Sequence, residues 1–343
     1  WNYIDACMIS AYLELYVMKK DKKYLNFCDD FVSAFVNEDG SINTYDIEEY
    51  NIDNIRPGKN LFKLFELTGN EKYRKAMDTV YSQLKTMPRT LEGNFWHKKI
   101  YPYQVWLDGL YMAQPFYMEY ETEYNRMRFC IDSFSQFENV ERIMKDTNTG
   151  LYYHGYDESR KSLWCDKKTG LSKNFWLRSI GWFILSLVDT ALVIDESLYY
   201  EFRRLKEMLY NLANDLLKFQ DESGMFYQLV DRKGDKDNYL ETSGSALISY
   251  AFLKAARNKL LPKRFEDYGR KIFDGILDKY LCVEGEELSL GGICLVAGLG
   301  GKENRDGSAE YYYSEPVVKN EAKGVAPLLM AYTEIIRLGM TYD

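Results

Sequence analysis

The sequence predicts an all-α protein whose helices pair into hairpins that close into a ring. Three observations lead to this fold: helical periodicity, a repeated hairpin, and long segments between hairpins. Eleven stretches carry apolar residues at i, i+3 and i+4, which places them on one face of a helix. These stretches are 4–19, 22–36, 58–67, 71–84, 105–119, 124–144, 175–194, 198–219, 243–258, 264–281 and 323–338.

An internal repeat indicates that the hairpin is the structural unit. Four residues of the first hairpin recur 49 positions later, with Leu15, Lys23, Tyr24 and Asp29 corresponding to Leu64, Lys72, Tyr73 and Asp78. The turn Lys20-Asp21 likewise corresponds to Gly69-Asn70. A single hairpin cannot bury both of its helices, so neighbouring hairpins must stack.

The segments between hairpins favour a closed ring over an open solenoid. Five are long and rich in Gly, Tyr, Trp and charge: 41–55, 87–104, 145–174, 220–241 and 284–320. Long loops usually carry function, whereas solenoid connections are short and regular. We expect six hairpins, the twelfth helix trimmed or irregular, with the loops converging at one end. No boundary has the composition of a linker, so we expect a single domain over 1–343.

The composition excludes several classes of partner. The 343 residues carry 44 Lys and Arg against 52 Asp and Glu, a net charge of −8, whereas nucleic acids and anionic membranes require clustered positive charge. No apolar stretch is long enough to span a bilayer. Six scattered cysteines and two histidines argue against a metal site and for a reduced, cytoplasmic setting. The sequence begins at Trp1 rather than Met, so we expect residues to precede it, and export stays open.

Unusual residues gather between positions 96 and 182. Five of the six tryptophans lie in this region, together with both histidines. Because aromatic rings are 16% of all residues, some of them belong to helix packing. The local concentration, however, indicates one pocket lined by flat rings, as ligand sites often are.

Two aspartates in this chain are candidate catalytic groups. Asp108 stands at the start of a helix beside Trp106, and Asp53 precedes another inner helix. Each could simply cap its helix and satisfy free backbone N–H groups. A partly desolvated carboxyl could instead act as a general acid, and two facing carboxylates suit sugar chemistry because each moves the pKa of the other.

Charged and imidazole side chains accompany these aspartates. Arg178 projects from a very apolar helix between Trp176 and Trp182, where it could form a structural ion pair or clamp a substrate carboxylate. His154 could bond to the backbone or contact substrate, and the same alternatives hold for His97, which Lys98 follows.

Seven motifs, taken in order, resemble a known family. They are IDNIRPGK (52–59), FWHK (95–98), WLDGLYMA (106–113), FWLRSIGW (175–182), ETSGSA (241–246), VAGLGG (296–301) and a final stretch over 306–325. Together they resemble glycoside hydrolase family 105, the unsaturated rhamnogalacturonyl hydrolases, and more distantly the unsaturated glucuronyl hydrolases.

The resemblance implies an (α/α)6 barrel and an uncommon reaction without metal or cofactor. The substrate is an oligosaccharide that a lyase has left with a C4=C5 double bond in its terminal uronic acid, and the enzyme removes that sugar by hydrating the bond. Asp108 would protonate C4 and then activate the attacking water, while Asp53 would orient the ring hydroxyls. The substrate-binding residues implied are Trp106, His97, Lys98, His154, Trp176, Arg178 and Trp182.

Three alternatives remain open from the sequence. Glucuronyl-type substrates could replace rhamnogalacturonan fragments, because the loops choose the second sugar. A conventional inverting glycosidase or a sugar epimerase could use the same ring of helices. A carbohydrate-binding protein would bind unsaturated uronides without turnover. The oligomeric state is not defined by the sequence.

Overall fold

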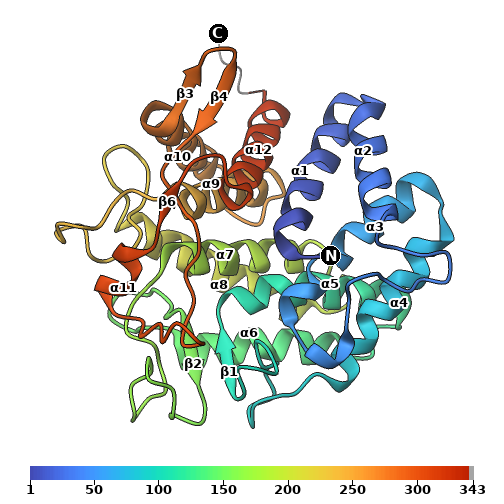
Figure 1. The fold of residues 1–343 in the computed structure, drawn as a ribbon, viewed down its shortest axis with the longest axis horizontal. Coiled ribbons are helices and arrows are strands. Elements are labelled where there is room, and N and C mark those ends of the chain that lie inside the picture. The colour runs from blue at the N-terminus through green and yellow to red at the C-terminus, as the bar shows by residue number, and fades with distance from the viewer. Residues whose placement is uncertain (340–343) are drawn as a thin grey trace.

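Inner and outer helices alternate around a closed ring, an (α/α)6 barrel, in the computed structural model, which describes residues 1–339. Each inner helix contacts its two inner neighbours, and α12 closes the ring against α1 (Figure 1). The inner helices are α1 (Tyr3–Lys19), α3 (Gly58–Thr68), α5 (Asp108–Tyr124), α7 (Leu177–Ala191), α9 (Thr242–Arg257) and α12 (Ala322–Arg337). The outer helices are α2 (Lys22–Ser33), α4 (Glu71–Thr86), α6 (Cys130–Met144), α8 (Tyr199–Leu217) and α10 (Arg264–Tyr280).

All eleven predicted helices are confirmed, with shifted ends. The structure adds α11 (Ala309–Ser314), a short helix inside the last long loop. Within residues 1–339 no outer helix follows α12, so the described ring has six inner and five outer helices.

The repeated turn has the geometry that its sequence implies. Lys20 and Gly69 end their helices in the left-handed region, at φ 55° and 67°. The next residues, Asp21 and Asn70, each accept a hydrogen bond from the backbone N–H two positions on. A left-handed residue followed by a capping side chain reverses the chain in two residues, so both hairpins turn tightly.

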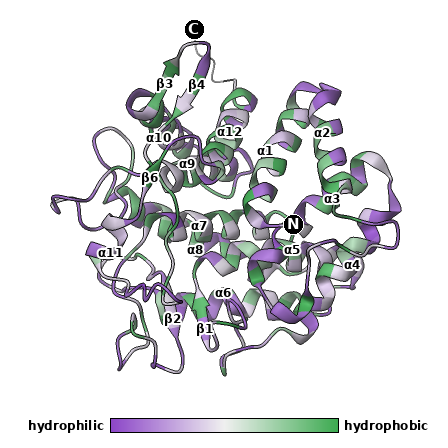
Figure 2. Cartoon of the chain, viewed as in Figure 1, coloured by the Kyte–Doolittle hydropathy of each residue, from purple (hydrophilic) through white to green (hydrophobic). Residues whose placement is uncertain are grey.

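The core of the barrel is continuous. One hydrophobic cluster includes residues from all six inner helices, and every residue of α7 is buried. Hydrophilic residues predominate along the long loops at the left of the view (Figure 2). All six cysteines are free. No helix in the described part of the chain combines the length and apolar character needed to cross a membrane.

Six short strands, which the sequence analysis did not predict, form three antiparallel pairs. They are β1 (Gln104–Trp106) with β2 (Gly155–Asp157), β3 (Leu281–Glu284) with β4 (Glu287–Leu290), and β5 (Ile293–Cys294) with β6 (Val317–Val318). Strands of two to four residues are too short to show an alternating pattern. The β1–β2 pair joins the long loop that precedes α5 to the loop that precedes α7.

Helices α7 and α9 approach closely because each presents a glycine to the other. A Cβ on Gly244 would lie 2.5 Å from Leu177 Cγ, and one on Gly181 would lie 2.9 Å from Leu247 Cβ. We expect Gly244→Ala to lower the free energy of unfolding by about 1–3 kcal/mol through overpacking, measured by urea unfolding. Gly234, which has nothing within 4 Å, provides the control.

Gly234→Ala should leave stability unchanged or raise it by up to about 1 kcal/mol, because it only restricts the unfolded chain. If both variants were equally stable, the two helices could separate without cost, and the close packing would not be a constraint.

Candidate active site

The N-terminal ends of the inner helices meet at one end of the barrel and bring the predicted residues together. Asp108 is the first residue of α5, Arg178 is the second of α7, and Asp53 lies in η2 (Ile52–Ile55), just before α3. The hydroxyl of Tyr3, the first residue of α1, feels the charges of all three. Burial raises the pKa of its hydroxyl, the negative charges of Asp53 and Asp108 add to this, and Arg178 opposes it.

Asp53 is held by two consecutive residues of the loop before α5. Lys98 Nζ lies 2.7 Å from Asp53 Oδ2, and His97 Nε2 lies 3.5 Å from Oδ1. The loop is fixed by a backbone bond, in which the Ile52 N–H donates to the His97 carbonyl at 3.1 Å. Burial alone would raise the pKa of Asp53, but Lys98 and His97 outweigh burial and lower it. Asp53 therefore stays ionised.

Asp53 does not cap its own helical turn. Asn51 is the residue whose side chain accepts the capping bond, from the Asp53 N–H at 3.1 Å. The carboxylate of Asp53 is therefore directed to Lys98 instead of to the backbone.

His97 is a neutral, buried imidazole. Its ring stacks on Trp106 with centroids 4.4 Å apart and planes at 14°. Burial lowers its pKa to about 4, although the charge of Asp53 works in the opposite direction. Gly109 leaves the ring its space, because a Cβ there would lie 3.2 Å from His97 Nδ1.

Asp108 has surroundings of a different kind. No Lys or Arg among residues 1–339 forms an ion pair with it, and its side chain caps no backbone N–H. His154 Nε2 lies 3.3 Å from Asp108 Oδ2, and neither atom has a hydrogen-bond partner in the described chain. His154 Nδ1 is 2.7 Å from the hydroxyl of Tyr312.

The β1–β2 pair sets the distance between Asp108 and His154. Trp106 pairs with Gly155 across the two strands, and the Leu107 N–H donates to the His154 carbonyl at 2.9 Å. The residue before Asp108 is thus bonded to the backbone of His154. Two loops that are distant in sequence deliver one carboxyl and one imidazole to the same place.

Trp106 and Trp176 form the buried aromatic walls of the site. Trp106 stacks on Tyr101 as well as His97, and its ring N–H donates to Gln104 at 3.0 Å. Trp176 packs against His154 with ring centroids 4.7 Å apart. The N–H of Trp176 donates to the Gln228 side chain at 3.2 Å. Both indole N–H groups are therefore hydrogen-bonded to other side chains of the protein.

Arg178 is buried without an ion-pair partner. It donates to Ser243 Oγ at 3.1 Å and to the Cys294 carbonyl, and its guanidinium carbon lies 4.8 Å from the centre of the Trp176 ring. No carboxylate within residues 1–339 forms an ion pair with it, so the alternative of a structural ion pair is not what the structure shows.

Trp182 lies apart from the other predicted site residues. It stands further along α7, 1% exposed, and stacks on Tyr111 with centroids 4.9 Å apart. This places Trp182 in the hydrophobic core of the barrel. The concentration of tryptophans that marked Trp182 for a pocket thus includes one residue of the core.

Two tyrosines of the site were assigned no role from the sequence. Tyr3 approaches both carboxylates, and Tyr312 holds His154. Tyr312 belongs to the run Tyr311–Tyr313 in the last long loop, which is the signal that could have marked it. Among the described residues, no group of three or more His, Cys, Asp or Glu could hold a metal ion.

The barrel and the two carboxyl groups at one end of it are consistent with a glycoside hydrolase, and the comparison with known families shows that class. The chain belongs to Glycosyl Hydrolase Family 88, whose family model matches residues 1–339. It is 43% identical to a family 105 glycoside hydrolase from C. acetobutylicum ATCC 824, with a TM-score of 0.95 over 98% of this chain and 94% of that one. The resemblance to family 105 is thereby confirmed, and the family is one of unsaturated uronyl hydrolases.

Two further relatives differ in how close they are. The unsaturated rhamnogalacturonyl hydrolase YesR of Bacillus subtilis (strain 168) is 28% identical over 284 residues, which cover 81% of this chain and 76% of YesR. The unsaturated glucuronyl hydrolase of Bacillus sp. GL1 is 16% identical, with a TM-score of 0.68 over 99% of this chain and 87% of that one. At 16% identity, the comparison with this second relative shows a common fold and nothing about function.

We expect His97 to remain uncharged well below neutral pH. The chain has two histidines, so a protein labelled at histidine Cε1 gives two imidazole resonances, and His97→Gln removes one of them. In NMR titration of the wild type, the resonance missing from the variant should titrate near pH 4, the value that burial imposes. A midpoint near the ordinary value of about 6.5 would contradict this.

The same pKa makes stability depend on pH. Below about pH 6.5 the unfolded chain binds a proton on His97 that the folded chain does not take up. The contribution of neutral His97 to the free energy of unfolding is therefore fully present above that pH and is lost as the pH falls toward 4. In urea unfolding over this range, the wild type should lose more stability than His97→Gln.

Proposed function

We propose that this protein removes the 4,5-unsaturated uronic acid from the non-reducing end of lyase-generated rhamnogalacturonan fragments by hydrating the C4=C5 double bond. The similarity to YesR, an unsaturated rhamnogalacturonyl hydrolase, supports this substrate class. The observation that carries the reaction type is the contrast between a carboxylate paired with lysine and a carboxyl that has no cationic Lys or Arg partner among the described residues.

This contrast assigns the proton donor. Asp53 is held ionised by Lys98 and therefore has no proton to give at neutral pH. Asp108 has no Lys or Arg partner among the described residues and lies beside the His154 imidazole, so we assign it as the group that delivers a proton to C4. Asp53, with its charge fixed, instead accepts hydrogen bonds from the hydroxyls of the sugar ring.

Protonation of C4 leaves positive charge at C5, next to the ring oxygen, and water then adds to C5. Asp108, now a carboxylate, takes a proton from that water as the new C5–O bond forms. The product is a hemiketal at C5, which opens to a ketone. The hemiacetal left at C1 then releases the neighbouring sugar, so atoms and protons balance with water as the single co-reactant.

His154 is the positioning residue of this scheme. If the Tyr312 hydroxyl donates to His154 Nδ1, the other ring nitrogen carries a hydrogen and lies 3.3 Å from Asp108 Oδ2. That arrangement leaves Asp108 Oδ1 to hold the proton for C4. The buried indoles of Trp106 and Trp176 keep His154 in place from both sides.

Arg178 supplies positive charge for the uronate carboxylate. It reaches the site from the second residue of α7 and has no ion-pair partner in residues 1–339 that would neutralise it. An anionic substrate can thus be bound locally although the whole chain carries a charge of −8.

Asp108→Asn should lower kcat by about 10³-fold, since an amide cannot transfer the proton. The assay follows loss of the ultraviolet absorbance of the conjugated enol in an unsaturated galacturonyl-rhamnose disaccharide. Asp30→Asn, an exposed aspartate on α2, is the matched control and should keep the wild-type rate. A rate within tenfold of wild type for Asp108→Asn would contradict the assignment.

The same assay defines the substrate. We expect faster turnover of the rhamnose-linked disaccharide than of unsaturated glucuronyl disaccharides. Preference for the latter would overturn the rhamnogalacturonan assignment. Cleavage of a saturated glycoside would instead identify a conventional glycosidase, and binding without turnover would identify a carbohydrate-binding protein.

A further inference from the structure

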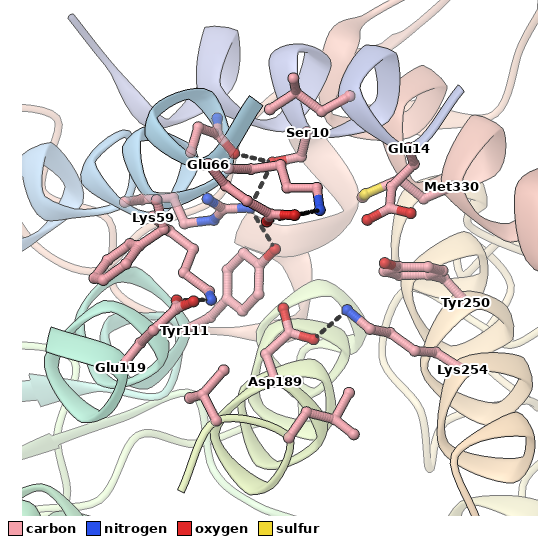
Figure 3. Close-up of a pocket in the computed structure, with 17 residues that line it drawn as sticks. Ser10, Glu14, Lys59, Glu66, Tyr111, Glu119, Asp189, Tyr250, Lys254 and Met330 are labelled. Carbon is pink, nitrogen blue, oxygen red and sulfur yellow. Dashed lines mark hydrogen bonds and ion pairs between the residues drawn. The ribbon is translucent and has the colours of Figure 1, made fainter. Parts of the chain in front are cut away.

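A second cavity lies on the barrel axis, at the end away from the carboxylates. Its volume is about 300 Å³, and all six inner helices line it (Figure 3). Glu14, Glu119, Asp189 and Lys254 come from the C-terminal halves of their helices, whereas Asp53 and Asp108 stand at helix starts. The cavity therefore opens at the opposite end of the ring.

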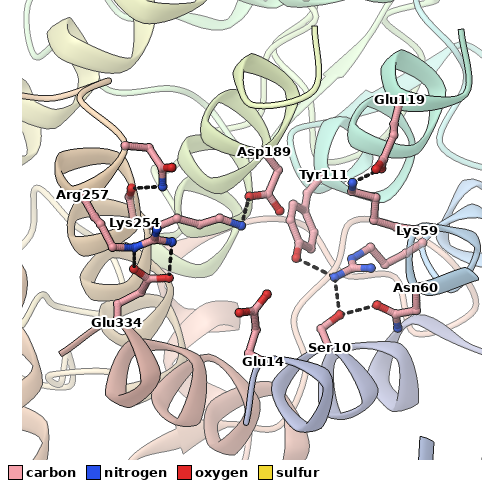
Figure 4. A network of polar contacts seen from close by, with 12 residues as sticks. Ser10, Glu14, Lys59, Asn60, Tyr111, Glu119, Asp189, Lys254, Arg257 and Glu334 are labelled. Carbon is pink, nitrogen blue, oxygen red and sulfur yellow. Dashed lines mark hydrogen bonds and ion pairs between the residues drawn. The ribbon is translucent and has the colours of Figure 1, made fainter. Parts of the chain in front are cut away.

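Most charges in this cavity are already paired. Figure 4 shows Lys254 bonded to Asp189, at 2.8 Å, and Lys59 bonded to Glu119. The remaining pairs are Lys63 with Glu66, at 2.8 Å, and Glu14 with Arg337, which also binds Glu334. Each of these cations thus has a carboxylate partner.

Arg56 is the exception. It is 3% exposed, lines the cavity, and forms no ion pair with any residue of the described chain. Its Nη2 donates to Ser10 Oγ and to Tyr111 Oη, both at 2.9 Å. Its Nε and Nη1 have no hydrogen-bond partner among residues 1–339. A buried guanidinium with free donors is costly unless an acceptor reaches it.

The exposure of the lining side chains shows which part of the cavity faces solvent. Side-chain exposure rises toward the rim, where Lys63 is 37% and Glu66 is 64% exposed. Lys59 and Glu119, at 20% and 19%, stand at intermediate depth. Arg56, at 3%, is more deeply buried than these four residues. The volume is at the lower end of those known for small-molecule sites, which suits a single sugar-sized molecule rather than an oligosaccharide.

We propose that this axial cavity binds a small hydroxylated carboxylate, with the carboxylate on Arg56 and the hydroxyls on the polar groups of the walls. An anion matches the unneutralised guanidinium, and arginine is well suited to carboxylates. The wall groups that can take up ligand hydroxyls are Asp189, Glu14, Tyr250 and Ser10. This site lies away from the carboxylates of the active site and does not depend on the proposed activity.

The test uses isothermal titration calorimetry of the whole protein with D-galacturonate. D-galactose, which lacks the carboxylate, and inorganic phosphate, which lacks the hydroxyls, are the comparison ligands. We expect galacturonate to bind and both others to bind at least tenfold more weakly. Absence of galacturonate binding, or equally tight binding of phosphate or galactose, would overturn the proposal.

Variants separate this cavity from the active site. Arg56→Gln should weaken galacturonate binding at least tenfold, whereas Arg178→Gln, which changes the other buried arginine, should leave a galacturonate site of wild-type affinity. The reverse pattern would place the ligand in the active site and overturn the proposal.

A second variant covers the case in which Arg56→Gln does not fold. Val193 lines the cavity and is half-buried, so Val193→Trp fills the space without removing a charge. Val193→Trp should abolish the galacturonate binding that Arg178→Gln leaves intact. Unchanged affinity in this variant would also overturn the proposal.

Discussion

Backbone pairing between long loops is the constraint on which the active site depends. The β1–β2 pair ties the loop before α5 to the loop before α7, and the Ile52 N–H ties the turn before α3 to His97. The barrel supplies only the starting points of the inner helices. The pairing of the loops then brings Lys98 into contact with Asp53 and His154 close to Asp108. Without it, both carboxylates would stand at free helix ends, where capping is the usual outcome.

The different electrostatic surroundings of Asp53 and Asp108 follow from that pairing. Two carboxylates at one end of a barrel would otherwise share similar surroundings, but the loop delivers its lysine to Asp53 alone. His97 adds no positive charge near neutral pH, because its burial keeps it neutral. Asp53 is thereby kept ionised, whereas Asp108 lies beside the imidazole of His154, whose other ring nitrogen contacts the Tyr312 hydroxyl. This difference is the basis for proposing Asp108 alone as the acid.

Much of the fold could be predicted because helical periodicity is a local property of the sequence. The eleven helices and the tight turns at Lys20 and Gly69 are encoded within a few residues each. The short strands are not, since two to four residues carry no readable pattern, and their pairing joins distant loops. For the same reason the sequence showed Asp53, His97 and Lys98 as separate candidates but not their contact. It also marked Trp182 for the site, which the structure places in the core.

The proposed reaction adds water across a carbon–carbon double bond, with the proton delivered to C4. Turnover of the unsaturated galacturonyl-rhamnose disaccharide in D2O tests it most directly, with the product examined early by NMR and mass spectrometry. We expect one deuterium bonded to C4 of the released keto-uronic acid. Release of the neighbouring sugar with the double bond intact and no deuterium at C4 would contradict it, because the bond broken would then be the ordinary glycosidic one.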